Sequence, residues 1–471
     1  MFIISQTLLK KTYYQMTMKR TSKMLATCLF FFVIAQTLAL AEDSLGVPEQ
    51  WTTENAVRFA LENNPNTAIT KQRIAAAQAA VQEANSAFYP RLDLNASYQQ
   101  TNNPMYSFGN ILTQGEFDNT IDFNNPGTTD NLGLNATISY KLYNGGRDQA
   151  GIDAAEANQN ASLYEMDIVR SELSFMVVKT LFTIVHAEET LQARQSALES
   201  IDASLQVAKA RYEAGDLLKT DLLNLEVHQF EARENMIQTQ HAVNLTKRSF
   251  LNLLGLEQGT VHVAPNCITE QLVPNDLSYQ KRPELQKLTA SIEAAEAHLR
   301  QAKSGYYPTA DAFAGYQVDH GFELGGSGNS WLGGIKINYN LFSGKQTEAQ
   351  VATAEARLAE QKQHQRKLTL AINLEVEKAK LTVEQAQQRL QVTGKMVELA
   401  EESASLHRER FKEGLILSSE LIDVENRLTD AKVRRTLARA AERIAVADLR
   451  RAVGLGQFDT ASQANDSMVN R

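Results

Sequence analysis

Cysteine is nearly absent from this sequence. The 471 residues contain two, Cys28 and Cys267. Cys28 lies within an N-terminal segment that we expect to be removed, and it does not follow an apolar run as a lipid-accepting cysteine would. Cys267 is then alone, so an intramolecular disulfide is excluded. Any argument for export has to rest on the N-terminal segment instead.

Long apolar runs, excess positive charge and catalytic patterns are also missing. Beyond residue 41 there is no apolar run of about 18 residues, so no later segment is expected to cross a bilayer as a helix. The net charge of −8 argues against nucleic acid as a partner. No Ser/His/Asp or Cys/His arrangement stands out, and the eight His form no metal-ligand spacing. We therefore predict no enzyme activity, no cofactor and no metal site.

Proline is absent from two long tracts. All nine prolines lie at or before Pro308, and none lies between Pro126 and Pro265. The tracts 127–264 and 309–471 are rich in Ala, Leu, Glu, Gln, Lys and Arg, which are good helix formers. The composition therefore predicts long, uninterrupted helices.

A seven-residue apolar repeat occurs in the first of these tracts. It consists of Leu191, Leu198, Leu205 and Tyr212, with Ile201 and Ala208 at the companion core spacing, which is typical of a coiled-coil seam. The predicted helix from Arg147 to Arg211 would be about 100 Å long. Helices of that length pack along one another. On the helices alone, a fibrous scaffold protein is an equal alternative.

The N-terminus has the layout of a secretory signal peptide. Basic residues Lys19, Arg20 and Lys23 precede an apolar run at 24–35, and small residues close it at Ala39-Leu40-Ala41. This pattern predicts cleavage after Ala41, with an uncleaved membrane anchor as the alternative. The basic residues lie deep in the chain, so translation starts at Met1, Met16 or Met18.

The mature sequence is duplicated. Tyr89-Pro90 matches Tyr307-Pro308, 138–145 matches 337–344, Arg211-Tyr212-Glu213-Ala214-Gly215 matches Arg410-Phe411-Lys412-Glu413-Gly414, and Leu254-Gly255-Leu256 matches Val453-Gly454-Leu455. The first pair is offset by 218 positions and the others by 199, so the first half has 19 extra residues. These fall between Thr101 and Asp130, a stretch rich in Asn, Gly, Thr and Pro that predicts a long exposed loop.

Four segments alternate between apolar and polar residues, two in each half. They lie near 91–99, 132–143, 309–319 and 331–342, and they are long enough for tilted strands that cross an outer membrane. Four strands cannot close a barrel, and an open edge in lipid would leave backbone groups unpaired. The chain must therefore share its strands. Two subunits would supply eight and three would supply twelve, and physics alone does not choose between them.

The ordered, duplicated landmarks resemble the TolC family of outer-membrane efflux and secretion channels. The resemblance covers about Trp51 to Leu455, and the residues that carry it are Ala60-Leu61-Glu62-Asn63-Asn64-Pro65, the two Tyr-Pro pairs, the turns at Gly145, Gly344, Gly215 and Gly414, and Arg282-Pro283-Glu284-Leu285. It implies a mainly α fold with β: long coiled-coil helices forming an α-barrel, and four strands per chain contributed to a shared trimeric outer-membrane β-barrel.

The same resemblance divides the chain and supplies its partners. We expect a signal peptide at 1–41, a first repeat at 42–256, an equatorial linker at 257–280, a second repeat at 281–455 and a tail at 456–471. Each repeat would hold a long helix, a tip turn and a second helix: 147–211, 212–219 and 220–254, then 345–411, 412–418 and 419–453. The implied partners are outer-membrane lipid, two further copies, an inner-membrane pump and a periplasmic adaptor.

Acidic residues follow each tip turn. In the family the tunnel closes at these turns, and by position the gate residues here are Asp221, Glu420 and Asp423, with Gly215 and Gly414 in the turns. Threefold crowding of like charges would favour cations. The alternative is that acids near a helix start only stabilise its dipole. The second turn lacks a basic residue to hold a closed state. In the first turn Lys219 is a candidate partner, with the alternative that it simply faces solvent.

The predicted function is a passive trans-periplasmic exit duct in a tripartite efflux or type I secretion system. The alternative is a non-conducting periplasmic coiled-coil structural protein, for which membrane-length strands with aromatic ends have no use. Small molecules, metal cations and proteins are all open as cargo, and the lack of Met or His clusters counts against a dedicated metal duct.

Overall fold

The computed structural model describes residues 47–264 and 272–458. In chain order these ranges hold α2 (Thr53–Asn63), α3 (Pro65–Asn85), β1 (Arg91–Thr101), α4 (Pro104–Thr113), β2 (Thr129–Tyr143), α5 (Arg147–Glu213), α6 (Lys219–Leu253), α7 (Pro283–Lys303), β3 (Thr309–His320), β4 (Ser327–Asn338), α8 (Gln346–Lys412) and α9 (Ser418–Ala452). Short 3-10 turns at Ser86–Phe88 and Ser304–Tyr306 lead into β1 and β3. Within the described ranges, each helix is too short or too polar to span a membrane.

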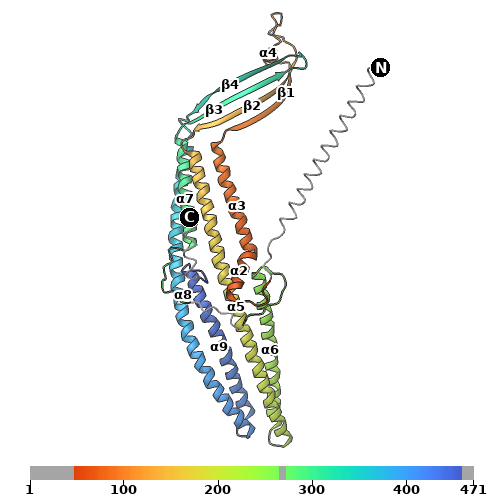
Figure 1. Ribbon diagram of the computed structural model, residues 1–471, viewed down its shortest axis with the longest axis vertical. Coiled ribbons are helices and arrows are strands. Elements are labelled where there is room, and N and C mark those ends of the chain that lie inside the picture. The colour runs from red at the N-terminus through yellow and green to blue at the C-terminus, as the bar shows by residue number, and fades with distance from the viewer. Residues whose placement is uncertain (1–46, 265–271, 459–471) are drawn as a thin grey trace, which may run out of the picture. The chain divides into compact units, whose positions relative to one another are not determined.

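The four strands form one antiparallel sheet in the order β1-β2-β3-β4 (Figure 1). Directly paired residues share a face of a sheet. One face, the apolar face, contains the rows Leu92–Ile138–Ala314–Gly333 and Leu94–Ala136–Tyr316–Trp331. The opposite, polar face contains the rows Asn95–Asn135–Gln317–Ser330 and Ser97–Gly133–Asp319–Gly328. The alternation in sequence is therefore a separation of faces, and β1 and β4 each keep one unpaired edge.

The expected exposed loop between Thr101 and Asp130 is wrong in part, because the segment contains α4. Asn103 caps this helix by accepting the N–H of Met105 at 3.1 Å, and Pro104 is its first residue. An Asn before a first-turn Pro is a helix-start signal that the loop-like composition concealed. Ser107, Asn110 and Ile111 of α4 are buried.

The last strand also differs from expectation. The apolar alternation predicted 331–342, whereas β4 starts at Ser327 and ends at Asn338. Its final pair is Thr309 of β3 with Asn338. The pairing stops there because Pro308, the residue before β3, has no N–H to donate. Beyond it, the side chain of Asn340 accepts the N–H of Phe342 at 3.2 Å, which starts a turn.

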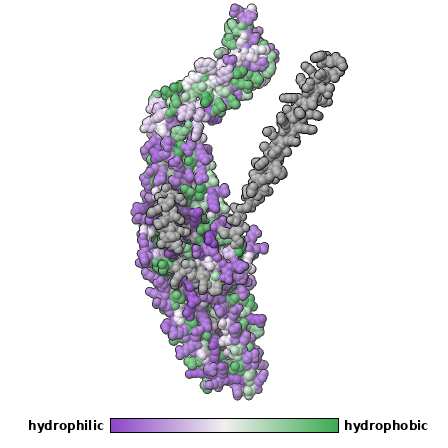
Figure 2. All heavy atoms as spheres, viewed as in Figure 1, coloured by the Kyte–Doolittle hydropathy of each residue, from purple (hydrophilic) through white to green (hydrophobic). Residues whose placement is uncertain are grey.

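The helices lie side by side in a layer. Between the sheet and the middle of the layer, α3 packs on α5, α5 on α7 and α7 on α8. Towards the other end, α6 packs on α5, α5 on α9 and α9 on α8. In both stretches α8 is one edge helix, and the opposite edge is α3 or α6. On the face shown in Figure 2, hydrophilic side chains predominate over the helices, and the sheet is more hydrophobic.

Two end-to-end helix junctions join these stretches, one in each half. Asn64, just before α3, donates from Nδ2 to the carbonyl of Leu253 at the end of α6, at 2.7 Å. Arg282, just before α7, donates from Nη1 to the carbonyl of Ala452 at the end of α9, at 3.1 Å. Each bond satisfies a carbonyl that a helix end leaves unpaired. The duplication therefore repeats a junction, with a neutral amide in one half and a buried guanidinium in the other.

The Arg282 junction is an ionic cluster. Its guanidinium also bonds Glu284 and Glu375. Arg451 joins it by donating to Glu375 at 2.7 Å, and the Arg451 guanidinium lies 5.1 Å from the ring centroid of Phe175 on α5. The cluster thus connects the start of α7, the middle of α8, the end of α9 and α5.

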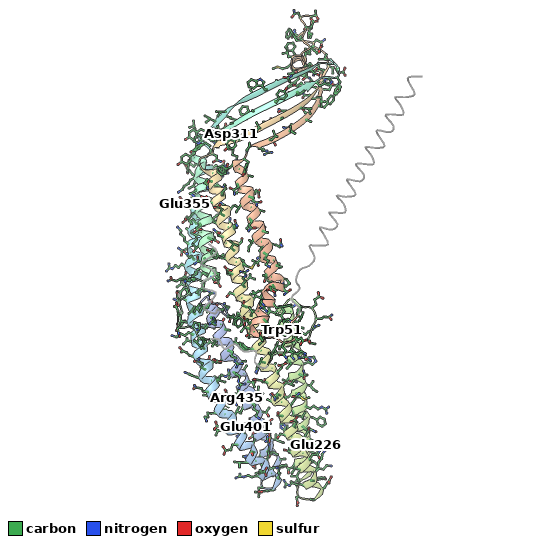
Figure 3. The ribbon with its side chains drawn as sticks, viewed as in Figure 1. Trp51, Glu226, Asp311, Glu355, Glu401 and Arg435 are labelled. Atoms are coloured by element: carbon green, nitrogen blue, oxygen red, sulfur yellow. The ribbon has the colours of Figure 1, made fainter. Side chains whose placement is uncertain are left out.

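The first junction lies against an apolar core around Trp51, which is fully buried (Figure 3). Its ring packs edge-on against the rings of Phe59 and Phe250, with distances between ring centroids of 5.4 Å and 5.6 Å. The Trp51 backbone pairs in parallel with the linker segment, donating to His262 at 2.8 Å and accepting from Ala264 at 3.1 Å. These contacts bring the expected equatorial segment onto the middle of the helical layer.

Several predictions lie outside the described residues. They are the signal peptide at 1–41 with its alternative start sites, Cys28, Cys267 and most of the C-terminal tail.

Candidate functional site

The two helix-to-helix turns lie at the end of the layer away from the sheet. Gly215 (φ 84°) and Gly414 (φ 78°) adopt left-handed backbone conformations that end α5 and α8. In each turn the next N–H returns to the helix: Asp216 donates to the Arg211 carbonyl at 2.8 Å, and Leu415 donates to the Arg410 carbonyl at 2.9 Å. This is the usual glycine-dependent way to stop a helix, and it occurs at both predicted positions.

The two turns pack on each other through a shared apolar cluster. Leu205, Ala208 and Leu225 come from the first hairpin, and Phe411 and Leu421 come from the second, and all five are buried. Residues about 200 positions apart in the chain are therefore in contact here, and the two turns of one chain form a single packed unit.

Arg211 connects the two turns and was missed from sequence as a functional residue. Its Nη1 donates to the Phe411 carbonyl at 2.8 Å, its Nη2 donates to the Asp216 carbonyl at 3.1 Å, and its guanidinium lies 5.4 Å from the Phe411 ring centroid. A Cβ at Gly414 would lie 2.9 Å from Nη2. The available signal was the arginine in the last turn of a helix, where it can bond terminal carbonyls.

Lys219, the candidate basic partner, is the first residue of α6 and is exposed. Within the described ranges its side chain forms no hydrogen bond or ion pair, which fits the alternative that it faces solvent in a single chain. In one chain the cation that joins the turns is therefore Arg211, and the role of Lys219 stays a prediction.

The structure brings two of the three predicted acids into one cleft. This cleft, of about 300 Å³, is lined by residues of both turns: Arg211, Asp216, Leu217, Leu218, Asp221, Gly414, Leu415, Ile416, Leu417 and Glu420. Asp221 accepts a hydrogen bond from the buried Ser418 hydroxyl at 2.7 Å, which ties the start of α6 to the start of α9. Glu420 is exposed. Three carboxylates thus line the cleft beside one guanidinium.

Asp423 does not line the cleft. It pairs with Arg427 one turn along α9 at 2.6 Å, and both side chains are more than half exposed. Such exposed pairs contribute little to stability. Asp221 and Glu420 lie in the first turns of α6 and α9, so the helix-dipole account fits them too. A gate made by all three acids remains a prediction.

The cleft is charged, with three carboxylates and one guanidinium in its lining. No group of three or more His, Cys, Asp and Glu residues within 47–264 and 272–458 is placed to hold a metal ion. The cleft is acidic and solvent-open, which favours cations over anions at the tip.

The chain is similar to known proteins. A family model described as "Outer membrane efflux protein" matches residues 56–256 and 276–455. The cobalt-zinc-cadmium resistance protein CzcC of Cupriavidus metallidurans is 21% identical over 307 residues, which are 64% of this chain and 72% of CzcC. The cation efflux system protein CusC of Escherichia coli is 24% identical over 195 residues, which are 41% of this chain and 39% of CusC.

The fold has solved counterparts. The outer membrane protein VceC of Vibrio cholerae superimposes with a TM-score of 0.73 at 18% identity, over 86% of this chain and 97% of VceC. This likeness confirms the predicted fold class, with long helices and four strands in an internally repeated chain.

Proposed function

The chain belongs to the outer membrane efflux protein family, and on that premise we propose how its parts build an export duct. It is a subunit of an outer-membrane efflux channel, with the strands in the outer membrane and the long helices in the periplasm. The family and the fold are those of transport channels. The protein supplies a path for cargo, and the energy comes from elsewhere.

The observation that carries the proposal is the unfinished sheet. β1 and β4 each have an unpaired edge, and the apolar face is open, with Leu94 and Trp331 largely exposed in a single chain. In lipid an unpaired strand edge costs several kcal/mol for each backbone group. Pairing β4 of one copy with β1 of the next removes both edges. We propose a homotrimer with twelve strands, with the polar face lining the lumen.

The helices carry matching open seams. In α6, exposed apolar residues recur at three-, four- and seven-residue spacings: Leu223, Val227, Phe230 and Ile237. In α8 the corresponding stripe is Leu370, Leu374, Leu381, Val392, Leu399 and Leu406. These helices are the two edges of the layer, and spacings of this kind form coiled-coil seams. Closing the layer therefore places α8 of one copy against α6 of its neighbour.

We further propose that an inner-membrane pump and a periplasmic adaptor engage the channel at the tips of α5–α6 and α8–α9. These tips are the end of the helices away from the membrane sheet. Their acidic cleft favours positively charged cargo. The similar proteins CzcC and CusC are named for cobalt-zinc-cadmium resistance and for cation efflux.

The test of the assembly uses two neighbouring residues of α8. Leu381→Glu places a charge in the proposed seam, whereas Thr382→Glu places the same charge on an exposed neighbour outside it. We expect the purified parent protein to migrate as a trimer and form pores in planar bilayers. Leu381→Glu should lose trimer and Thr382→Glu should keep it. A parent protein that is monomeric and forms no pores would refute the proposed duct.

A further inference from the structure

The polar face of the sheet is covered at the end far from the helices and open along the rest. Asp319 and Asn131 are only 1% and 7% exposed, whereas Asn95 and Ser330, on the same face nearer the helices, are exposed. The covering residues come from 102–128, the segment between β1 and β2 that includes α4. We name it the β1–β2 segment.

Two glycines of the β3–β4 turn and one at the start of β4 leave the space that this segment occupies. A Cβ at Gly328 would point to the same face as its strand partner Asp319 and would lie 1.9 Å from the carbonyl oxygen of Thr113. A Cβ at Gly321 would lie 2.0 Å from Oε1 of Gln114, and one at Gly326 would lie 2.7 Å from the Gln114 carbonyl oxygen. Because Gly328 faces the polar side, the β1–β2 segment crosses over the polar face.

Buried hydrogen bonds hold the segment there. Gln114 donates from Nε2 to the Asp130 carbonyl at 2.6 Å and to Oδ1 of Asn131 at 3.1 Å. Asn131 in turn donates to Asp319 at 2.6 Å. The Asp130 carboxylate accepts the N–H of Phe322 at 3.0 Å and of Glu323 at 2.8 Å, both in the β3–β4 turn. Breaking a buried set of this kind leaves polar groups unpaired, so it holds one arrangement.

Large apolar side chains are exposed on the segment, among polar residues such as Glu116 and Asp118. Met105 is 83% exposed and Tyr106 is also exposed, and the rings of Phe108 and Phe123 are 4.3 Å apart. Large apolar side chains that face water at a channel mouth narrow it and repel water. The second half has no such segment, because the 19 extra residues belong to the first half alone.

We propose that the β1–β2 segment is a lid that folds inward over the polar face, latched by Gln114, and that three copies narrow the external mouth of the duct, with the exposed apolar side chains of the segment as part of the constriction. This proposal rests on the proposed function, because the polar face becomes a lumen only in the closed assembly. The lid would restrict bulky cargo at the end opposite the acidic tip. The constriction is complete only when the β1–β2 segments of all three copies meet.

The experiment measures entry from outside the cell. Asn95→Cys places a thiol on the open part of the polar face, in a chain whose native Cys267 is replaced by Ser. Intact cells are treated with a small membrane-impermeant thiol reagent or with a polymer-coupled maleimide. Gly328→Ala forces the Thr113 backbone away. The control, Gly333→Ala on the same strand, brings a Cβ no closer than 3.7 Å to any neighbour.

We expect the small reagent to label both variants at similar rates. Polymer labelling should rise about tenfold in Gln114→Ala, because losing the two Gln114 hydrogen bonds is worth about one decade in population. It should also rise in Gly328→Ala, through the clash with Thr113, and stay unchanged in Gly333→Ala. Gln114→Ala removes the Gln114 hydrogen bonds without introducing a clash. It therefore tests the lid even if Gly328→Ala fails to assemble. Equal polymer labelling in the latch variants and the control overturns the lid alone. Absence of labelling by the small reagent overturns the duct and the lid together.

Discussion

Arg282 is the residue whose replacement should weaken the helical layer most. In Arg282→Met the Ala452 carbonyl loses its donor, Glu284 loses its cation, and Glu375 keeps only Arg451. Removing one partner of a buried ion pair costs about 3–5 kcal/mol. The two glutamate side chains are 25% and 32% exposed, so water screens part of this. We therefore expect a loss of about 2–3 kcal/mol in the free energy of unfolding.

The matched control is the equivalent residue of the first half. Asn64→Ala loses one bond to the Leu253 carbonyl and the cap on the N–H of Asn66. That loss should cost about 1–2 kcal/mol. The assay is thermal unfolding of the detergent-solubilised trimer, followed by far-UV circular dichroism. Arg282→Met should lower Tm more than Asn64→Ala does, and a smaller or equal decrease would refute the ionic account of the junction.

The pH dependence gives a second check on the same cluster. Burial raises the pKa of Glu375, but hydrogen bonds and charges from Arg282 and Arg451 outweigh burial and hold the pKa below its ordinary value. A carboxyl with a lowered pKa stabilises the fold above its unfolded pKa of about 4.3, and this contribution is lost as pH falls through the lower folded pKa. The Tm difference between parent and Arg282→Met should therefore be full near neutral pH and shrink in acid. A difference independent of pH would exclude this mechanism.

Two further outcomes concern the tip and the strand-to-helix turns. Asp221→Ala combined with Glu420→Ala should raise single-channel conductance and weaken block by multivalent cations in planar bilayers. Glu226→Ala, on α6 further from the tip turn and outside the cleft (Figure 3), should change neither. Unchanged conductance and block in the double variant would reject the gate. Lys345 has a left-handed backbone (φ 67°) where the first half has Gly146 (φ 80°), so Lys345→Gly should raise stability by about 0.5–1 kcal/mol, visible as a higher Tm that Lys345→Ala does not share.

Much of the architecture follows from local patterns. Heptad spacing and missing prolines predict the long helices, and alternation predicts which residues of the strands share a face, because both depend on neighbours within a few positions. The glycines that end α5 and α8 could also be located, since a left-handed residue is a local requirement. Duplication then supports each prediction with a second instance.

The predictions that failed depend on contacts between distant residues. Composition made 102–128 look like an exposed loop, yet Gln114 fits a space left by glycines about 200 positions further on. Arg211 looked like a landmark of the repeat, yet its carbonyl partner Phe411 belongs to the other hairpin. Nothing near either residue in the chain marks these partners.

The sequence by itself determined the repeat, the helices, the strand faces and the turns, because periodicity and backbone preference act over a few residues. Only the tertiary structure decided which cation joins the two tips, which groups close the end-to-end junctions and to which face the β1–β2 segment folds. These depend on the packing of one half against the other, where small sequence differences, such as Asn64 against Arg282, give equivalent positions different chemistry.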